Sequence, residues 1–199
     1  MYLYDDRVPF LISRTIPDAK ILIMLRDPAE RAYSQYLHLR RNGREKVSDF
    51  AVALEREESR VSRGWGPDWH YCRRSRYREQ IERYLSAFDE SAVYVCLLDD
   101  LKERQSELMR GIFAFLGVDD AFQAEAEHRN AGKVSQDGPR RRGPLDRVLK
   151  RIASSSSSAG SKAAFGVPDK AIQYIRERTD EDVRWLEEHL DRDLSAWTS

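Results

Sequence analysis

A short apolar run followed at once by a helix start constrains the fold more than any other feature of this sequence. Residues 20–25, KILIML, lack the alternation of a half-exposed strand and indicate a strand buried on both faces, as in a parallel sheet. Asp27 is a favourable N-cap and Pro28 a favourable first helical residue, and the helix is expected to stop at Gly43. The unit is half of a βαβ motif and predicts an α/β fold.

The rest of the chain repeats this alternation of buried strands and amphipathic helices. A second strand is expected over residues 92–98, AVYVCLL. Helical spacing of apolar residues predicts further helices, with two of them after Pro168. The predicted helices before that point cover residues 48–60, 71–88 and 99–116.

Length and charge limit the class of protein. The 199 residues suit one domain, here taken as residues 1–199, with a flexible Ser-rich segment at 153–166. No apolar run approaches the ~18 residues of a membrane span, and no secretory signal is present, so a cytoplasmic protein without a membrane partner is expected. The net charge of zero conceals a net +6 over residues 129–151 and a net −4 over residues 168–199.

The cysteines and histidines suggest neither a disulfide nor a metal centre. Cys72 and Cys96 are two thiols in a chain without an export signal, so reduced thiols are expected. The four histidines show no paired spacing of metal ligands, which predicts that the protein binds no metal.

Arg26 and Ser34 form the most informative pair. Arg26 follows the first strand, at the sheet edge where α/β proteins bind ligands, and the next helix directs its N-terminal amides to the same place. Ser34 lies about two turns into that helix, so the two could clamp a phosphate. The alternative is an ion pair of Arg26 with Asp27 or Glu30, with Ser34 a small packing residue.

The segment around this pair, LRDPAERAYSQY, resembles the 3′-phosphate-binding motif of sulfotransferases that use 3′-phosphoadenylyl sulfate (PAPS). The resemblance implies that Arg26 and Ser34 hold the 3′-phosphate of PAPS, the co-substrate. It also implies a P-loop-NTPase-like parallel sheet flanked by helices. The pattern is most similar to bacterial members related to the heparan sulfate branch.

Further segments resemble the same family, in the family's order along the chain. Tyr77, in SRYREQIERYLSAF, resembles the Tyr of a Gly-x-Tyr segment, although Ser75 replaces the usual Gly. The stretch AVYVCLLDDLKERQSELMRGIFAFLGV resembles the later strand and helix, and EDVRWLEEHLDRDLSAW resembles the C-terminal helix, which ends at a Trp, here Trp197.

A basic loop at residues 129–143 gains a role from this resemblance. In the family a basic segment near this point closes over the nucleotide and helps to bind its 3′-phosphate. Arg140, Arg141 and Arg142 are therefore further candidates for nucleotide binding. The alternative is a solvated loop.

Two parts of the family pattern do not occur in this sequence. One is a strand followed by a Lys-Ser/Thr-Gly-Thr-Thr type loop, which cradles the 5′-phosphosulfate. The other is the general base, which lies upstream of the Arg26 motif in the family, so the catalytic residue is unassigned and expected before Met1. We therefore expect a chain that starts late and lacks the first strand and the phosphate loop.

The leading hypothesis is transfer of a sulfuryl group from PAPS to a hydroxyl or amine of a carbohydrate or small molecule. The alternative is a catalytically incomplete module that binds nucleotide or a protein partner. A P-loop kinase is disfavoured because GxxxxGK[ST] is absent. A nucleic-acid binder is not expected, because no nucleic-acid module accompanies the basic stretch.

Overall fold

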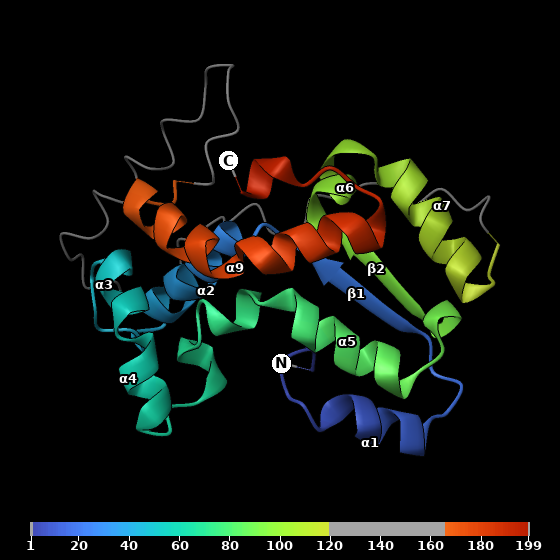
Figure 1. The fold of residues 1–199 in the computed structure, drawn as a ribbon, viewed down its shortest axis with the longest axis horizontal. Coiled ribbons are helices and arrows are strands. Elements are labelled where there is room, and N and C mark those ends of the chain that lie inside the picture. The colour runs from blue at the N-terminus through green and yellow to red at the C-terminus, as the bar shows by residue number, and fades with distance from the viewer. Residues whose placement is uncertain (1, 120–165, 199) are drawn as a thin grey trace, which may run out of the picture.

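The protein is described from a computed structural model, which describes residues 2–119 and 166–198. Two parallel strands form its sheet in these residues, β1 (Ile21–Leu25) and β2 (Val93–Leu97). The register pairs Ile21 with Val93 and runs to Leu25 and Leu97, so both carboxyl ends meet at one edge. Helices surround the strands (Figure 1), which confirms an α/β architecture with a parallel sheet flanked by helices.

The helices differ widely in length, from single turns to 22 residues. The α-helices are α1 (Val8–Thr15), α2 (Pro28–Arg41), α3 (Phe50–Glu55), α4 (Glu57–Ser62), α5 (Tyr77–Ala87), α6 (Leu98–Glu103), α7 (Gln105–Leu116) and α9 (Asp169–Leu190). Short 3-10 turns are η1 (Pro67–Trp69), η2 (Arg73–Ser75), η3 (Glu90–Ala92) and η4 (Ser195–Trp197).

The long helix α9 joins two parts of the core. Figure 1 shows it running past α2 and across the sheet. Towards its start, Ala171 and Ile175 pack with the buried face of α2 and with α3. Towards its end, Val183 and Leu186 pack with α5 and with the sheet. The strand end and the start of α2 are thereby held between α5 and α9.

Only one face of β1 is buried. Ile23 and Leu25 lie in the core, whereas Leu22 and Met24 are each 43% exposed. Leu22 and Met24 pair with Tyr94 and Cys96 of β2, whose side of the sheet packs against α7. The prediction of a strand buried on both faces is wrong for β1, because the α7 layer covers β2 and leaves β1 open.

Several predicted helices are shorter or divided. The stretch 48–60 forms α3 and α4, which meet at Arg56, and its N-cap is Asp49. The helix predicted from residue 71 begins at Tyr77, after η2. The stretch 99–116 divides at Arg104 into α6 and α7. After Pro168 one α-helix, α9, replaces the two expected, because its apolar spacing is unbroken up to the left-handed residue Asp191.

The predicted basic loop and most of the Ser-rich segment, up to residue 165, lie outside the described residues. The prediction of one domain over residues 1–199 stays a prediction. Among the helices of residues 2–119 and 166–198, none is long and apolar enough to cross a membrane.

Candidate functional site

Arg26 is the residue that follows β1, and its backbone is fixed by α5. The Tyr77 hydroxyl donates a hydrogen bond of 2.8 Å to the Arg26 carbonyl oxygen. Tyr77 is 2% exposed, and this burial raises the pKa of its hydroxyl to about 12. The family-like Tyr77 therefore ties the first turn of α5 to the carboxyl end of β1.

The start of α2 is capped as its sequence predicts. The Asp27 carboxylate accepts a hydrogen bond of 2.8 Å from the Glu30 backbone N–H, and Pro28 takes the first helical position. Asp27 is buried, and burial raises the pKa of its carboxyl because the charged form loses hydration. This cap directs the N-terminus of α2 towards the strand end that carries Arg26.

Arg26 and Glu30 form an ion pair at this helix start. Nε and Nη2 of Arg26 both donate to Oε2 of Glu30, over 2.8 and 2.6 Å. The two side chains are 18% and 20% exposed. The ion pair that the sequence left open as an alternative is therefore present.

Ser34 lies one helical turn beyond Glu30. Residues four apart share a helix face, so the Arg26 ion pair and Ser34 lie along one side of α2. Ser34 is half-buried, and within the described residues its hydroxyl makes no hydrogen bond. The residue that pairs with Arg26, Glu30, thus lies on the same face of α2 as Ser34.

Ser75, the departure from the family's Gly, has a defined structural role here. Its side chain is fully buried, and its hydroxyl donates to the Pro28 carbonyl oxygen over 3.0 Å. The same hydroxyl accepts a hydrogen bond of 2.8 Å from Nε of Arg31. A hydroxyl at this position therefore fixes the start of α2 against η2.

Arg31 strengthens this attachment from the α2 side. Its guanidinium also donates to the Gln35 side-chain oxygen and to the Tyr71 carbonyl oxygen. Burial lowers the pKa of Arg31 to about 10, because the charge is removed from water. The helix that carries Ser34 is therefore anchored by a partly buried charge one turn from its start.

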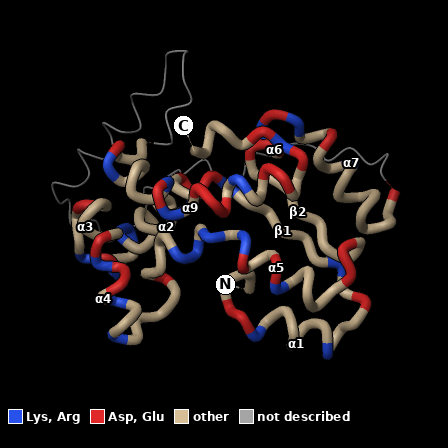
Figure 2. The backbone as a smooth tube through the Cα atoms, in the orientation of Figure 1, with Lys and Arg blue, Asp and Glu red and all other residues tan. Residues whose placement is uncertain are grey.

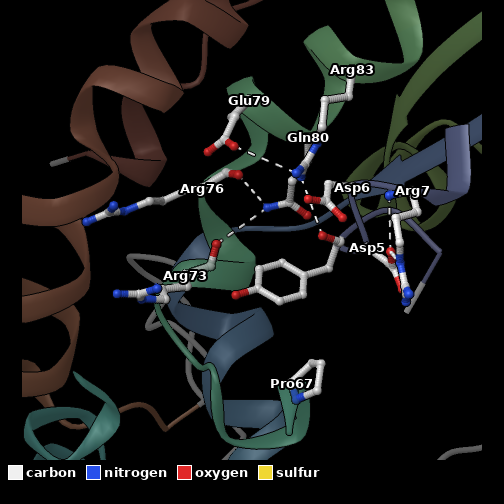
Figure 3. Close-up of a pocket in the computed structure, with 10 residues that line it drawn as sticks. Asp5, Asp6, Arg7, Pro67, Arg73, Arg76, Glu79, Gln80 and Arg83 are labelled. Carbon is white, nitrogen blue, oxygen red and sulfur yellow. Dashed lines mark hydrogen bonds and ion pairs between the residues drawn. The ribbon is translucent and has the colours of Figure 1, made fainter. Parts of the chain in front are cut away.

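A cavity of about 590 Å³ lies on another side of α5, and no sequence motif indicated it. Figure 3 shows Gln80 and Arg83 from α5 beside Asp6 and Arg7 from the N-terminal segment. Figure 2 shows basic positions before α5 and acidic positions near the N-terminus. The lining residues are polar or charged, apart from one proline: Tyr4, Asp5, Asp6, Arg7, Pro67, Arg73, Arg76, Glu79, Gln80 and Arg83.

Some charges of the cavity are already paired. Arg7 pairs with Asp5 at 2.8 Å, which lowers the pKa of Asp5 to about 2. Arg83 lies 3.7 Å from a carboxylate oxygen of Glu79. Nε of Arg83 is buried and has no hydrogen-bond partner among the described residues. One donor of this cavity-lining arginine is therefore left unsatisfied by its protein neighbours.

Two sequence predictions about ligands, one on the basic loop and one on metal binding, concern other parts of the chain than the groups described above. Arg140, Arg141 and Arg142 lie outside the described residues. In the part of the chain that the structure describes, no group of three or more His, Cys, Asp or Glu residues could hold a metal ion.

Comparisons with known proteins match the chain over most of its length. The family model of the sulfotransferase domain matches residues 10–160. A sulfotransferase from Alicyclobacillus acidocaldarius, known from its crystal structure, is 29% identical, with a TM-score of 0.73 over 100% of this chain and 65% of that chain. This likeness confirms the predicted P-loop-like parallel sheet flanked by helices.

Curated relatives include two bifunctional heparan sulfate N-deacetylase/N-sulfotransferases 1. The Mus musculus protein is 32% identical over 126 residues, and the Xenopus tropicalis protein is 27% identical over 130 residues. The matches cover 59% and 61% of this chain, but they span only 14% of each relative's length. Because the family model covers more than half of the residues, the chain belongs to the sulfotransferase domain family.

Proposed function

We propose that this chain takes part in sulfuryl transfer from PAPS to a hydroxyl or amine of a carbohydrate or small molecule. One observation carries the proposal: Arg26 and Ser34 lie along one side of α2, at the carboxyl end of a parallel strand. This edge of an α/β sheet is where such folds bind nucleotides.

The groups at this edge suit a phosphate monoester. The Arg26 fork already directs Nε and Nη2 at an oxyanion, the Glu30 carboxylate, within hydrogen-bond distance. The Ser34 hydroxyl supplies a neutral donor, and the N-terminus of α2 adds a favourable electrostatic field. We assign the 3′-phosphate of the nucleotide to these groups.

The chain's own contribution is to bind and orient the nucleotide. PAPS, when bound, supplies the sulfuryl group and the leaving phosphate. Arg26 and Ser34 hold the opposite, 3′-phosphate end, so they restrict how the donor lies and raise its effective concentration at the acceptor. The hydrogen bond from Tyr77 holds the Arg26 backbone, and therefore supports this orientation from α5.

We assign the acceptor to the cavity beside α5. It lies one turn from Tyr77 along that helix, and its arginines and carboxylates suit a ligand rich in hydroxyl or amine groups. Relatives that are heparan sulfate N-sulfotransferases by name support a carbohydrate with an amine as one acceptor class.

The nucleotide assignment is tested by calorimetric titration of the chain with adenosine 3′,5′-bisphosphate. Arg26→Ala should weaken binding by roughly 10- to 150-fold, the equivalent of one charged hydrogen-bonded contact. Ser34→Ala should weaken it by roughly two- to tenfold. Arg78→Ala is the matched control, because Arg78 makes the same i,i+4 pair with Glu82 away from β1.

Equal affinities for wild type and Arg26→Ala would remove Arg26 from the nucleotide site. Transfer itself is measured with radiolabelled PAPS and a panel of hydroxyl- and amine-bearing glycans. Nucleotide binding without transfer to any of them would favour the alternative, a nucleotide-binding module.

A further inference from the structure

We propose that Glu30 is an internal counter-ion of Arg26, which an incoming phosphate displaces, and that it thereby sets the anion affinity of the site. The inference rests on the proposed function, since it takes Arg26 as a phosphate ligand. It adds a residue that tunes binding without itself holding the nucleotide.

The geometry makes Glu30 a competitor for the same donors. A guanidinium binds a phosphate best through two parallel N–H groups, and Nε with Nη2 is one such edge. Both of these N–H groups of Arg26 donate to Oε2 of Glu30. A phosphate that takes this edge must first release the carboxylate.

The displacement needs only a side-chain rotation. The backbone of Glu30 is held separately, because its N–H donates to the buried Asp27 carboxylate over 2.8 Å. The released carboxylate stays in the first turn of α2, where the helix dipole stabilises a negative charge. Its side chain is 20% exposed, so the released carboxylate can reach water.

The same arrangement sets a penalty on binding. Before phosphate arrives, the ion pair stabilises the ligand-free site, and afterwards two negative groups lie at one helix start. Both effects oppose the anion, so removal of the Glu30 charge should tighten binding. The pair is largely shielded from water, and the effect should exceed that of an exposed i,i+4 pair.

The chain supplies a matched control on α5. Arg78 and Glu82 form an i,i+4 ion pair with a 2.8 Å contact, as Arg26 and Glu30 do at 2.6 Å. That pair is exposed, at 52% and 44% of its side chains, and it does not involve the strand end. Glu82→Gln thus removes the same kind of charge without freeing Arg26.

The test is titration with adenosine 3′,5′-bisphosphate of wild type, Glu30→Gln, Glu82→Gln, Arg26→Ala and the double variant Arg26→Ala with Glu30→Gln. Glu30→Gln should bind about three- to tenfold tighter than wild type, and Glu82→Gln should stay within about twofold. In the Arg26→Ala background the gain from Glu30→Gln should shrink, because the donors for which Glu30 competes are gone.

The outcomes separate this inference from the function on which it rests. If Arg26→Ala weakens binding while Glu30→Gln is unchanged or weaker than wild type, the counter-ion role is overturned and the nucleotide site stands. An equal gain with and without Arg26 would also overturn it, since Glu30 would then act only by repulsion of the ligand. If wild type does not bind the nucleotide, the proposed function fails and the inference fails with it.

Discussion

The hydrogen bond between Tyr77 and the Arg26 carbonyl is a direct test of how the fold positions the site. Tyr77→Phe removes the hydroxyl but keeps the ring, so it leaves no cavity in the core. The Arg26 carbonyl oxygen then loses its 2.8 Å donor beside a side chain that is 2% exposed. A buried acceptor left unsatisfied costs about 1–3 kcal/mol.

Both the stability and the nucleotide affinity should therefore change. The free energy of unfolding, measured by urea denaturation, should fall by about 1–3 kcal/mol. The melting temperature should fall by about 2–4 °C for each of these kcal/mol. The affinity for adenosine 3′,5′-bisphosphate should fall by about two- to fivefold, because Arg26 is held less firmly for binding.

Tyr84→Phe is the matched control for this change. Tyr84 is on the same helix and 3% exposed, and its hydroxyl donates 2.9 Å to the Tyr2 carbonyl oxygen rather than to the strand end. The Tyr84→Phe variant should lose about as much stability as Tyr77→Phe and keep the nucleotide affinity of wild type. Wild-type stability of Tyr77→Phe, or the same loss of affinity in both variants, would show that this hydrogen bond does not position Arg26.

Two further changes test the ion pairs that hold the fold together. Asp100→Asn should cost about 1–2 kcal/mol at pH 7, because Asp100 accepts hydrogen bonds of 3.1 and 2.9 Å from Arg192. These bonds lower the pKa of the Asp100 carboxyl. Its contribution to the free energy of unfolding is therefore present above the unfolded pKa of about 4 and is lost as the pH falls through the folded pKa. Urea denaturation of wild type and Asp100→Asn should show a smaller difference in unfolding free energy at pH 3 than at pH 7. The same difference at both pH values would contradict the role given to Asp100. Glu45→Gln should cost about 3–5 kcal/mol in thermal or urea unfolding, because it leaves the 7% exposed Arg60 without its buried carboxylate, and a loss below 1 kcal/mol would show that the pair is not buried in solution.

The start of α2 could be predicted from the sequence because its determinants are local. Asp27 caps the helix and Pro28 begins it, and both functions depend only on neighbouring residues. The division of residues 99–116 at Arg104 and the exposure of Met24 could not be predicted in this way. Both depend on which distant element covers a given face, and apolar runs alone do not identify that element.

The candidate site shows the same limit. The positions of Arg26 and Ser34 follow from the strand–helix unit, whereas the choice of Glu30 over Asp27 as ion-pair partner depends on side-chain geometry. The cavity depends on contacts between distant segments, for example the Tyr84 hydroxyl on the Tyr2 carbonyl.

We propose that the strand end and the start of α2 hold the 3′-phosphate of a nucleotide. The most direct measurement compares the affinity of the chain for adenosine 3′,5′-bisphosphate with that for adenosine 5′-monophosphate, in wild type and in the Arg26→Ala, Ser34→Ala double variant. We expect wild type to prefer the 3′-phosphorylated ligand by at least about tenfold and the double variant to lose this preference. An equal preference in both proteins would contradict it, since the 3′-phosphate would then be held elsewhere.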